Sequence, residues 1–555
     1  FTVLPGAVFN GASYKMTLQG PGALWSTPGA DYRMTSGHYL RWSSPSLFVA
    51  AGSTVNALIE LTGKATLQGD LTLIESSRLY PHTGSVLDAR SSTLTLRGNS
   101  DIVSASSGTL YLHDADSWIV YEGTGADRGL NLSTAPYGGL RFNPSGSGYL
   151  TLKTITLDGS LWLQRGVVLS SFTPVITVKG HLLDLGGRVD LSTPTVSTLR
   201  LGGSARQRVV VSTGDIFWDF EIASSSSVVL ESSRLRVRGG LGLSGGVLEA
   251  GSSRISIDGD WRGRGGRFQA DASTVSFESA SATQTFVDTA GPYFNGLSVT
   301  ASFVVFSSTF SAAALSASSP TYSLSFSTAP GGTTQVGDLR LRGWTAHRMR
   351  LASSQPGTPW GLKVVSVSSV TLCDISDSDA VSGLLIHAND GLSLDSGGNS
   401  GWNFRPTLVL LSPGESFAEG AGKSGTPSTR TVGVPFTLTA RAVSAASGTV
   451  VNSSILTSVA TSDPFDAEPA AKNLSSGVST FSVSLRTAEP LPRSAVLTAL
   501  SAGAFVAGGS TVPVSPAAFD RMQVLLPGEA PLPGSELGRT GEPELQTVAR
   551  SFSIT

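Results

Sequence analysis

The stretch Ser197-Thr-Leu199…Gln207…Gly214-Asp-Ile-Phe217 returns in the same chain as Ser273-Thr-Val275…Gln284…Gly291-Pro-Tyr-Phe294. The offset between the copies is 76 at their first serines (273 minus 197) and 77 at their phenylalanines (294 minus 217). A repeat of this length equals roughly three to four coils of about 20–25 residues, the usual size of a β-solenoid coil. The repeat therefore favours a solenoid over a single sandwich or barrel.

Polar and apolar residues alternate around this repeat, which indicates strands rather than helices. Thr93-Leu-Thr-Leu96 and Arg254-Ile-Ser-Ile257 have period two. Such runs end in Gly-polar pairs, for example Gly98-Asn99 and Asp258-Gly259, and short strands between such turns are typical of all-β folds. One coil cannot bury its inward apolar residues, whereas stacked coils can. We therefore predict that residues 1–404 form a parallel β-helix, right-handed in preference to left-handed.

A second, independent repeat begins after Gly401-Trp-Asn-Phe404. Leu408-Val-Leu-Leu-Ser-Pro-Gly-Glu415 matches Met522-Gln-Val-Leu-Leu-Pro-Gly-Glu529, and the offset between the two prolines is 114 (527 minus 413). Thr431-Val…Phe436-Thr-Leu-Thr439 matches Thr547-Val…Phe552-Ser-Ile-Thr555 at an offset of 116 (547 minus 431). About 115 residues of alternating strands is the size of one immunoglobulin-like sandwich.

This second repeat predicts the rest of the domain organisation. We expect an immunoglobulin-like β-sandwich over residues 405–519, without an inter-sheet disulfide, and the start of a second, incomplete repeat over residues 520–555. A third of a sandwich leaves its edges and half-core without partners. We expect the sequence to be cut from a longer polypeptide, or else this segment to pair with another chain. The opening Phe1-Thr-Val3, without Met, also indicates a processed chain or a fragment.

Composition excludes several classes of function. Only 14% of residues are charged and the net charge is −2, so no basic face is available for nucleic acid. No run of 18 apolar residues exists, so we expect no membrane span. One cysteine, Cys373, excludes an internal disulfide framework and a cysteine-based zinc site. The 64 glycines and abundant Ser and Thr are typical of exported β-proteins.

The stretch from Ile257 to Val299 resembles the β-helical repeats of large bacterial secreted and cell-surface proteins of the haemagglutinin and adhesin type. The matching pieces are Ile257-Asp-Gly-Asp-Trp261, Gly265-Gly-Arg-Phe268, Ser273-Thr-Val-Ser-Phe277, Gln284-Thr-Phe286 and Phe294-Asn-Gly-Leu297. Asp271 stands where that group has glycine. Gly296 sits one place late, which predicts a different turn after Phe294.

Two further stretches carry a similar resemblance. Residues 337–404, which include Gly337-Asp-Leu-Arg-Leu341 and end in Gly398-Asn-Ser-Gly-Trp-Asn-Phe404, look like the terminal coils of such solenoids. Residues 408–439 are similar to the tandem bacterial immunoglobulin-like repeats that often follow them. The resemblance implies adhesion, a stalk or surface-structure formation outside the cell, and it says little about a ligand.

β-Helices also host polysaccharide lyases and glycosidases, which need paired carboxylates facing one groove with a basic residue nearby. Residues at i and i+2 of a strand share a face, so three pairs are candidates: Asp114/Asp116 beside His113, Asp219/Glu221, and Asp258/Asp260. The last pair lies on a turn signature, where aspartate is favoured for its own backbone hydrogen bonds. We predict no catalytic residue.

The densest acidic cluster is Asp374, Asp377 and Asp379, with Asp390 and Asp395 downstream. Oxygen-rich loops can bind calcium, so the first three are weak candidate metal ligands. Their spacing matches no fixed calcium loop, and Asp-Ser repeats are common in turns. We therefore expect no metal and no cofactor, with calcium as the alternative.

Other motifs favour a structural interpretation. Gly240-Leu-Gly242-Leu-Ser-Gly245 fits G-x-G-x-x-G, and Gly242-Leu-Ser-Gly-Gly246 fits G-x-S-x-G, but neither has the strand-turn-helix setting that its chemistry requires. We expect glycine-rich turns between coils there. Cys373 is expected to be a small packed residue. Exposed tryptophans could stack on glycans, although core stacking or capping of the coils is favoured for all four candidates: Trp118, Trp162, Trp218 and Trp344.

The sequence thus predicts a non-catalytic extracellular structural or adhesive protein, a rigid rod or stalk segment of a longer polypeptide. Its expected partners are neighbouring domains of the same chain, other copies or cell-surface glycans. The first alternative is a β-helix carbohydrate-active enzyme, which an acidic groove with two carboxylates and a cation would favour. The second is a subunit of a self-assembling extracellular fibre, which mass spectrometry of the native polypeptide would distinguish from one giant chain.

Overall fold

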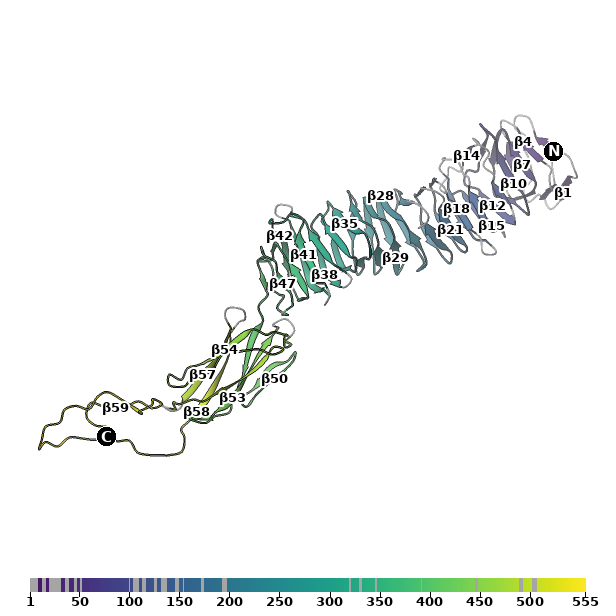
Figure 1. Cartoon of the computed structure of the whole chain (residues 1–555). Coiled ribbons are helices and arrows are strands. Elements are labelled where there is room, and N and C mark those ends of the chain that lie inside the picture. Colours follow the sequence, from purple (N-terminus) through teal and green to yellow (C-terminus); the bar gives the residue numbers. More distant parts are fainter. Residues whose placement is uncertain are drawn as a thin grey trace. The chain divides into compact units, whose positions relative to one another are not determined.

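The computed structural model describes residues 8–11, 16–18, 31–34, 39–43, 47–49, 52–98, 100–102, 109–111, 116–123, 127–130, 137–144, 149–152, 154–170, 174–191, 197–318, 321–328, 332–344, 347–390, 392–444, 448–488, 493–501 and 507–555. These residues form strands and turns throughout (Figure 1). Contacts divide the chain into two compact units. Unit 1 comprises residues 1–338 and 351–365, and unit 2 comprises residues 339–350 and 366–555.

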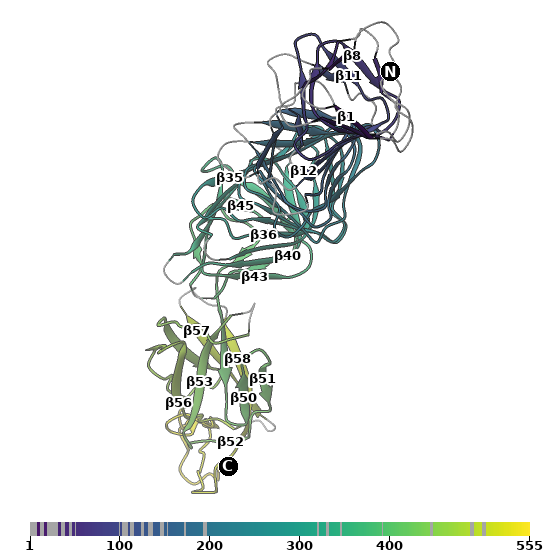
Figure 2. The ribbon, with the colours of Figure 1, turned by 90° about the vertical axis from the view of Figure 1, so that its right-hand side faces the viewer.

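Unit 1 is a parallel β-solenoid, in which strands of successive coils overlie one another (Figure 2). Its longest sheet contains β1 (Val8–Gly11), β3 (Asp31–Met34), β6 (Ser53–Asn56), β9 (Leu71–Leu73), β12 (Thr93–Gly98), β15 (Trp118–Gly123), β17 (Gly139–Phe142), β19 (Ile155–Leu157), β20 (Leu161–Leu163), β22 (Val175–Val178), β23 (Leu182–Asp184), β25 (Thr198–Leu201), β26 (Gln207–Val210), β28 (Asp219–Leu230), β30 (Leu241–Glu249), β32 (Trp261–Gly263), β33 (Arg267–Gln269), β35 (Thr283–Asp288), β37 (Phe303–Phe306), β39 (Ser323–Phe326) and β41 (Met349–Ser353).

A second long sheet follows another side of the coils. It contains β16 (Asp127–Leu130), β18 (Tyr149–Leu152), β21 (Val167–Ser170), β24 (Arg188–Leu191), β27 (Ile216–Phe217), β29 (Arg234–Val237), β31 (Arg254–Ile257), β34 (Thr274–Phe277), β36 (Tyr293–Val299), β38 (Ser311–Ser318), β40 (Thr333–Arg342) and β42 (Trp360–Val364). The first coils add two short parallel sheets: β2 (Met16–Leu18), β4 (Tyr39–Trp42), β7 (Leu58–Leu61), β10 (Arg78–Pro81) and β13 (Asp101–Ile102), then β5 (Leu47–Val49), β8 (Lys64–Leu67), β11 (Val86–Asp88) and β14 (Thr109–Tyr111).

The coil length follows from the strand register. Ser53 pairs with Leu71, an offset of 18 (71 minus 53), and Leu94 pairs with Ile119, an offset of 25 (119 minus 94). These offsets are close to the expected coil of about 20–25 residues. The solenoid has about 14 turns. The predicted all-β fold with a parallel solenoid is therefore confirmed.

The core of unit 1 is a column of apolar side chains, one from each coil. Each of its members pairs with the next and is at most 3% exposed: Leu199, Phe220, Leu241, Trp261, Phe286, Phe306 and Phe326. At one end of the column, the Phe326 and Trp360 rings stack with centroids 4.0 Å apart. Period-two alternation in the sequence creates this column because every second side chain of a strand points inward.

One turn recurs between coils and depends on a left-handed residue. Gly251 and Asp271 have φ of 57° and 46°. Two residues later in each turn, Ser253 and Ser273 are buried and donate their N–H to the carbonyl three residues back, at 3.1 and 2.9 Å. Asp271 therefore keeps the turn although it replaces the glycine that the resemblance expects, since aspartate tolerates this backbone region better than most residues.

The two copies of the repeat that predicted the solenoid share a local hydrogen-bonding pattern, but they do not occupy the same position in the coil. Gln207 and Gln284 are both buried, and each amide group donates to two carbonyl oxygens of the preceding coil. Leu199 pairs with Phe220 in the first sheet, whereas the matching Val275 pairs with Leu297 in the second. The offset between the copies is therefore not a whole number of coils.

A second expectation from the resemblance is also corrected here. A different turn was expected after Phe294 because Gly296 sits one place late. Instead, β36 continues through both residues to Val299, and Gly296 pairs in register with Thr274 and Ala314 on either side.

Unit 2 begins with the terminal parallel coils. There, the second half of β40 pairs with β43 (Ser368–Thr371), β44 (Cys373–Ile375) pairs with β47 (Leu394–Asp395), and β46 (Ile386–His387) pairs with β48 (Trp402–Asn403). β45 (Ser378–Asp379) belongs to the same coils. Antiparallel pairing begins directly after them, at β49 (Thr407–Leu411). This change of strand direction lies at the predicted junction after residue 404.

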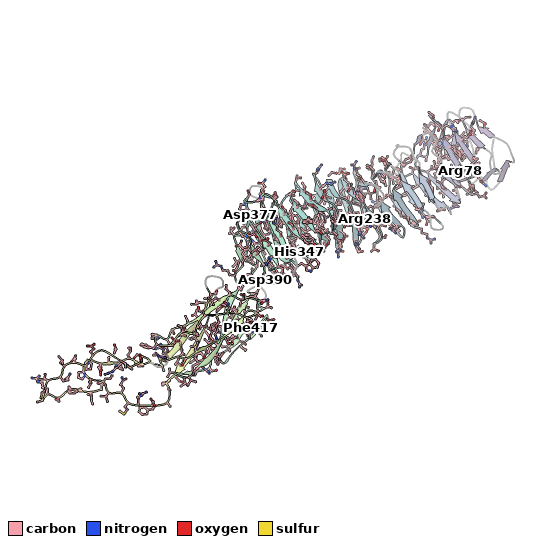
Figure 3. The ribbon with its side chains drawn as sticks, in the orientation of Figure 1. Arg78, Arg238, His347, Asp377, Asp390 and Phe417 are labelled. Carbon is pink, nitrogen blue, oxygen red and sulfur yellow. The ribbon has the colours of Figure 1, made fainter. Side chains whose placement is uncertain are left out.

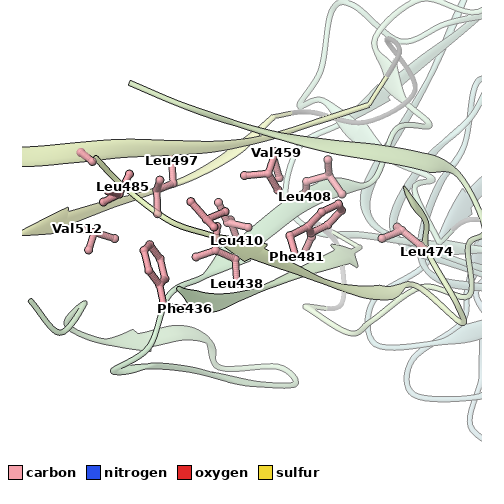
Figure 4. Packing of buried hydrophobic residues seen from close by; sticks show 14 of the residues in the cluster. Leu408, Leu410, Phe436, Leu438, Val459, Leu474, Phe481, Leu485, Leu497 and Val512 are labelled. Atoms are coloured by element: carbon pink, nitrogen blue, oxygen red, sulfur yellow. The ribbon is translucent and has the colours of Figure 1, made fainter. Parts of the chain in front are cut away.

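Two antiparallel-rich sheets follow and enclose one apolar core (Figure 4). The first consists of β49, β53 (Phe436–Val443) and β56 (Val478–Val483), and the second of β52 (Arg430–Thr431), β58 (Gly508–Ser515), β57 (Arg493–Ser501), β54 (Leu456–Thr461) and β55 (Lys472–Asn473). Leu410, Leu438 and Phe481 from the first sheet and Leu497 and Val512 from the second are at most 1% exposed. A hairpin, β50 (Glu415–Ala418) with β51 (Gly422–Gly425), precedes β52. Beyond residue 519, β59 (Ala530–Pro531) pairs with β60 (Arg539–Thr540).

Candidate functional site

A shallow depression open to solvent lies on one side of unit 1 and has a volume of about 240 Å³. Its walls come from four successive strands of the long sheet: β25, β28, β30 and β32. The residues that determine its chemistry are Asp219, Glu221, Gly240, Gly242, Arg262 and Arg264. The acidic pair that the sequence placed on one strand face therefore does share a face, and basic side chains from two coils further along approach it.

The floor of the depression consists of glycine. Gly242 lies inside β30 without a left-handed backbone, and a Cβ at this position would meet Cγ of Glu221 at 3.4 Å, an ordinary contact. A larger residue would therefore fit the strand, because outward positions of a strand accept most side chains. The missing side chain leaves the space between the acidic wall on β28 and the basic wall on β32.

Both carboxylates are held by neighbours. Asp219 Oδ1 accepts the N–H of Gly240 at 2.6 Å. Glu221 Oε2 accepts from Nε of Arg200 at 2.7 Å, and its Oε1 accepts from the Ser244 hydroxyl at 2.8 Å. Glu221 is thus a bridge between three successive coils, whereas Asp219 has one oxygen committed to the backbone.

The pair Asp258/Asp260 lies in the turn after β31. Asp260 Oδ2 forms an ion pair with Arg262 at 2.9 Å, and its Oδ1 accepts the N–H of Thr285 at 2.8 Å. Burial raises the pKa of Asp258 above its ordinary value. These contacts give Asp260 the role of a turn acceptor between coils. Of the third pair, Asp116 is exposed, while His113 and Asp114 lie outside the described residues.

Two of the three candidate metal ligands accept hydrogen bonds from serine hydroxyls of the next coil. Asp374 Oδ1 accepts the Ser396 hydroxyl, and Asp379 Oδ1 accepts the Ser400 hydroxyl at 2.8 Å. Asp377, labelled in Figure 3, occupies a left-handed position with φ of 54°. Within the described ranges, no three His, Cys, Asp or Glu side chains come together as a metal-binding group.

The two downstream aspartates also accept hydrogen bonds. Asp390, also labelled in Figure 3, accepts the backbone N–H of Ser393 at 2.7 Å and, through its other oxygen, that of Leu372 at 2.7 Å. Asp395 Oδ1 accepts the side-chain amide of Asn399 at 2.7 Å. Asp379, Asp390 and Asp395 each also accept the backbone N–H two residues ahead, as in Asx-type turns, whereas Asp374 connects two coils.

Cys373 is a packed residue. Its side chain is fully buried, and burial raises the pKa of the thiol to about 12. The S–H group donates to the carbonyl of Thr371 at 3.3 Å. Nucleophilic chemistry needs an accessible thiolate, and this thiol is neither accessible nor ionised at neutral pH.

The glycine motif was expected to form turns between coils, and this is wrong for most of its length. Only Gly240 precedes the strand; from Leu241 onward the motif lies inside β30, which runs to Glu249. Ser244 donates to Glu221 and to the carbonyl of Ile222. Hence it bridges coils and does not occupy a strand-to-helix elbow.

The tryptophans divide by exposure. The rings of Trp118 and Trp162 are 4.9 Å apart, and both residues are half-buried, as is Trp218. Trp344 is 50% exposed. Core stacking or capping of the coils was favoured for all four residues, and the exposure of Trp344 is inconsistent with core stacking.

Sequence reasoning missed a buried acidic pair in unit 1. Asp215 is 2% exposed, and burial raises its pKa to about 7, reinforced by Asp184 and opposed by hydrogen bonds from Val189 and Ser212. Asp184 is 4% exposed, and its Oδ2 has no hydrogen-bond partner within the described part of the chain. Each residue sits beside a glycine-containing turn, a context that in sequence indicates a solvent-facing aspartate.

In comparisons with known proteins, no family model, no curated protein and no solved structure matches this chain. In the described residues, no helix is long and apolar enough to cross a membrane.

Proposed function

We propose that this chain is a segment of an extracellular, non-catalytic structural and adhesive rod. The observation that supports it most directly is how unit 1 uses its charged residues. In six ion pairs an acidic side chain pairs with a basic one a single coil away, 19 to 25 residues apart in sequence, while Arg188–Asp190 and Arg262–Asp260 are two residues apart. The pairs are Arg41–Glu60, Arg97–Glu122, Asp158–Lys179, Arg200–Glu221, Arg208–Glu231 and Arg254–Glu278.

These ion pairs connect coils instead of converging on a substrate. Each contributes little alone, because exposed pairs are worth roughly 0–1 kcal/mol. A continuous apolar column with such pairs along its outside resists separation of the coils, and stacked repeats form long surfaces suited to weak multivalent contacts. Neighbouring domains, further copies and cell-surface glycans are the partners that such a surface would meet.

Two finer features belong to the same proposal. The solenoid is right-handed, since parallel strand-to-strand crossovers are right-handed in nearly all known sheets. The two sheets of residues 407–515 form an immunoglobulin-like sandwich, which agrees with their shared core and with a repeat length of about 115 residues. As part of a surface protein, this sandwich acts as a spacer after the rod.

A second candidate is a carbohydrate-active enzyme, and the depression is the observation that favours it. Asp219 and Glu221 face Arg262 and Arg264 across a glycine floor, the groove composition that glycan-cleaving β-helices need. The ion pair and hydroxyl contact of Glu221 argue against a free second carboxylate. We therefore assign the depression to ligand contact within the adhesive function.

One experiment separates the two candidates. The full chain is incubated with neutral and acidic polysaccharides, and both retention and newly formed chain ends are measured. We expect retention without cleavage, and weaker retention for Gly242→Thr, which fills the depression; Gly214→Thr, at an exposed position outside the depression with room for a side chain, is the control. Cleavage that disappears in both Asp219→Asn and Glu221→Gln would overturn the non-catalytic assignment.

A further inference from the structure

Residues 522–555, called here the second copy, reproduce part of the local structure of residues 408–439, the first copy: the hairpin, its glutamate anchor and one backbone pairing. The β59–β60 hairpin pairs Ala530 with Thr540. Subtracting the sequence offsets of 114 and 116 gives Ser416 and Ser424, which pair in the β50–β51 hairpin. The hairpin is thus formed at the same positions of both copies.

The strand partners around the hairpin also correspond. Leu525 and Thr555 exchange both backbone hydrogen bonds, at 2.9 and 3.1 Å. The matching positions, Leu411 and Thr439, are partners in the antiparallel pair of β49 and β53. At this one position the two segments of the second copy therefore meet in the register of the first copy, although neither segment forms a strand.

A charged anchor is repeated as well. In the first copy, Glu415 accepts the N–H of Ser412 at 2.8 Å and pairs with Lys423. In the second copy, Glu529 accepts the N–H of Leu526 at 2.8 Å and pairs with Arg539. The turn chemistry is therefore intact in both copies.

Burial is where the copies differ. The core positions of the first copy are at most 7% exposed, and their counterparts in the second copy are 49–84% exposed: Leu408 and Met522, Leu410 and Val524, Phe436 and Phe552, Leu438 and Ile554. In the register of the first copy these four positions share one face, and large apolar side chains exposed together in this way are the kind of patch that marks an interaction site.

The first copy shows what chemistry covers this face. Along β53, Phe436 pairs with Val483 and Leu438 with Phe481, both on β56. The opposing sheet adds apolar side chains such as Leu497 on β57 (Figure 4). The cover is thus one antiparallel edge strand plus a second sheet whose inward residues alternate with polar ones.

We propose that the apolar face of residues 522–555 binds a complementing β-polypeptide of the kind that residues 440–515 supply to the first copy. The complement adds an antiparallel strand beside Phe552–Thr555 and closes a second sheet over Val524 and Ile554. Pre-formed turns and register make the second copy a template for this strand addition. A second copy of the same face is a poorer occupant, because it lacks the opposing sheet.

The test uses the full chain with residues 440–519 appended after Thr555, and it follows amide hydrogen exchange of residues 522–555. We expect protection to rise by at least about 100-fold at Val524, Leu525 and Ile554 compared with the chain that ends at Thr555. Ile554→Asp in the hybrid chain should abolish the gain. Ser553→Asp should keep it, since the matching Thr437 faces solvent.

A duplicate of residues 406–439 in place of 520–555 in the same hybrid serves as the positive control. Protection of that control without protection of the native second copy would overturn the proposal. Concentration-dependent pairing of the unextended chain, with protection of residues 552–555, would also overturn it by assigning the face to a second molecule.

Discussion

The two copies of the antiparallel repeat share a hairpin, a glutamate anchor and the backbone pairing at Leu525 and Thr555, but their apolar residues have opposite environments. In the first copy, Leu438 is buried beneath a second sheet, and in the second copy the matching Ile554 is 59% exposed. Local hydrogen bonds therefore form without a core, because glycines, a glutamate anchor and a basic partner specify them within each copy. Burial of the apolar side chains, by contrast, requires strands outside the copy, such as β56 and β57 for the first copy. Differences in stability between matched substitutions should thus measure the contribution of tertiary structure alone.

The largest expected difference comes from introducing a charge at the matched core positions. Leu438→Asp places an unpaired carboxylate in the core and should destabilise residues 407–515 by at least about 4 kcal/mol. Ile554→Asp should change the stability of that region by less than about 0.5 kcal/mol. Region-resolved hydrogen exchange of the full chain measures both effects. Equal losses would show that the second copy is already covered.

A smaller effect is expected where both copies depend on the same backbone. Gly425 and Gly541 have φ of 85° and 84°, and a Cβ at either would clash with the carbonyl of Gly414 or Gly528. Alanine at either site should cost its hairpin about 1–2 kcal/mol. Exchange rates in β50–β51 and β59–β60 report the loss. A cost confined to Gly425→Ala would mean that the second hairpin is not specified locally.

The glutamate anchor adds a pH dependence. Burial raises the pKa of Glu415, but Lys423 and hydrogen bonds from Ser412 and Ser510 outweigh it, so the net pKa lies below its ordinary 4.5. This lowered pKa contributes stability above pH 4.5 that is lost as pH falls through the folded value. Glu415→Gln should cost about 1 kcal/mol at pH 7 and much less below pH 4. Unfolding midpoints at both pH values check this, with Glu419→Gln as an exposed control.

The smallest effect is expected inside the solenoid, where Gly251 and Asp271 hold equivalent left-handed positions in the turns of two successive coils. Asp271→Gly should stabilise unit 1 by about 0.5 kcal/mol, because glycine adopts the left-handed φ without strain. Gly251→Asp should destabilise it by a similar amount. Thermal unfolding of the two single variants and of the double exchange measures the shifts. Shifts in one direction for both would contradict a shared turn geometry.

Much of the fold was predictable because it depends on short-range patterns. Period-two alternation predicts strands, and Gly-polar pairs predict turns, so the parallel solenoid followed from the sequence. The ladder to which each strand belongs did not follow: Leu199 and Val275 match in sequence and lie in different sheets. Pairing between strands one coil apart depends on how every intervening turn is made, and an irregular coil shifts the rest.

The candidate site divides in the same way. The shared face of Asp219 and Glu221 follows from strand geometry alone. The basic wall from Arg262 and the glycine floor at Gly242 come from later coils, and nothing local connects them to the acidic pair. The buried carboxylate of Asp215 was hidden for a related reason, since its turn-like context in sequence says nothing about the coil that covers it.

The sequence by itself determined what neighbouring residues decide: an all-β chain, Gly-polar turns and the alternation that divides inward from outward side chains. Tertiary structure alone decided which strands stack, where a depression opens, and which of two similar segments is buried. The physical reason is the difference in sequence separation over which the two kinds of interaction act. Turn and strand preferences are satisfied by hydrogen bonds over a few residues, whereas burial removes apolar surface from water only when distant segments meet.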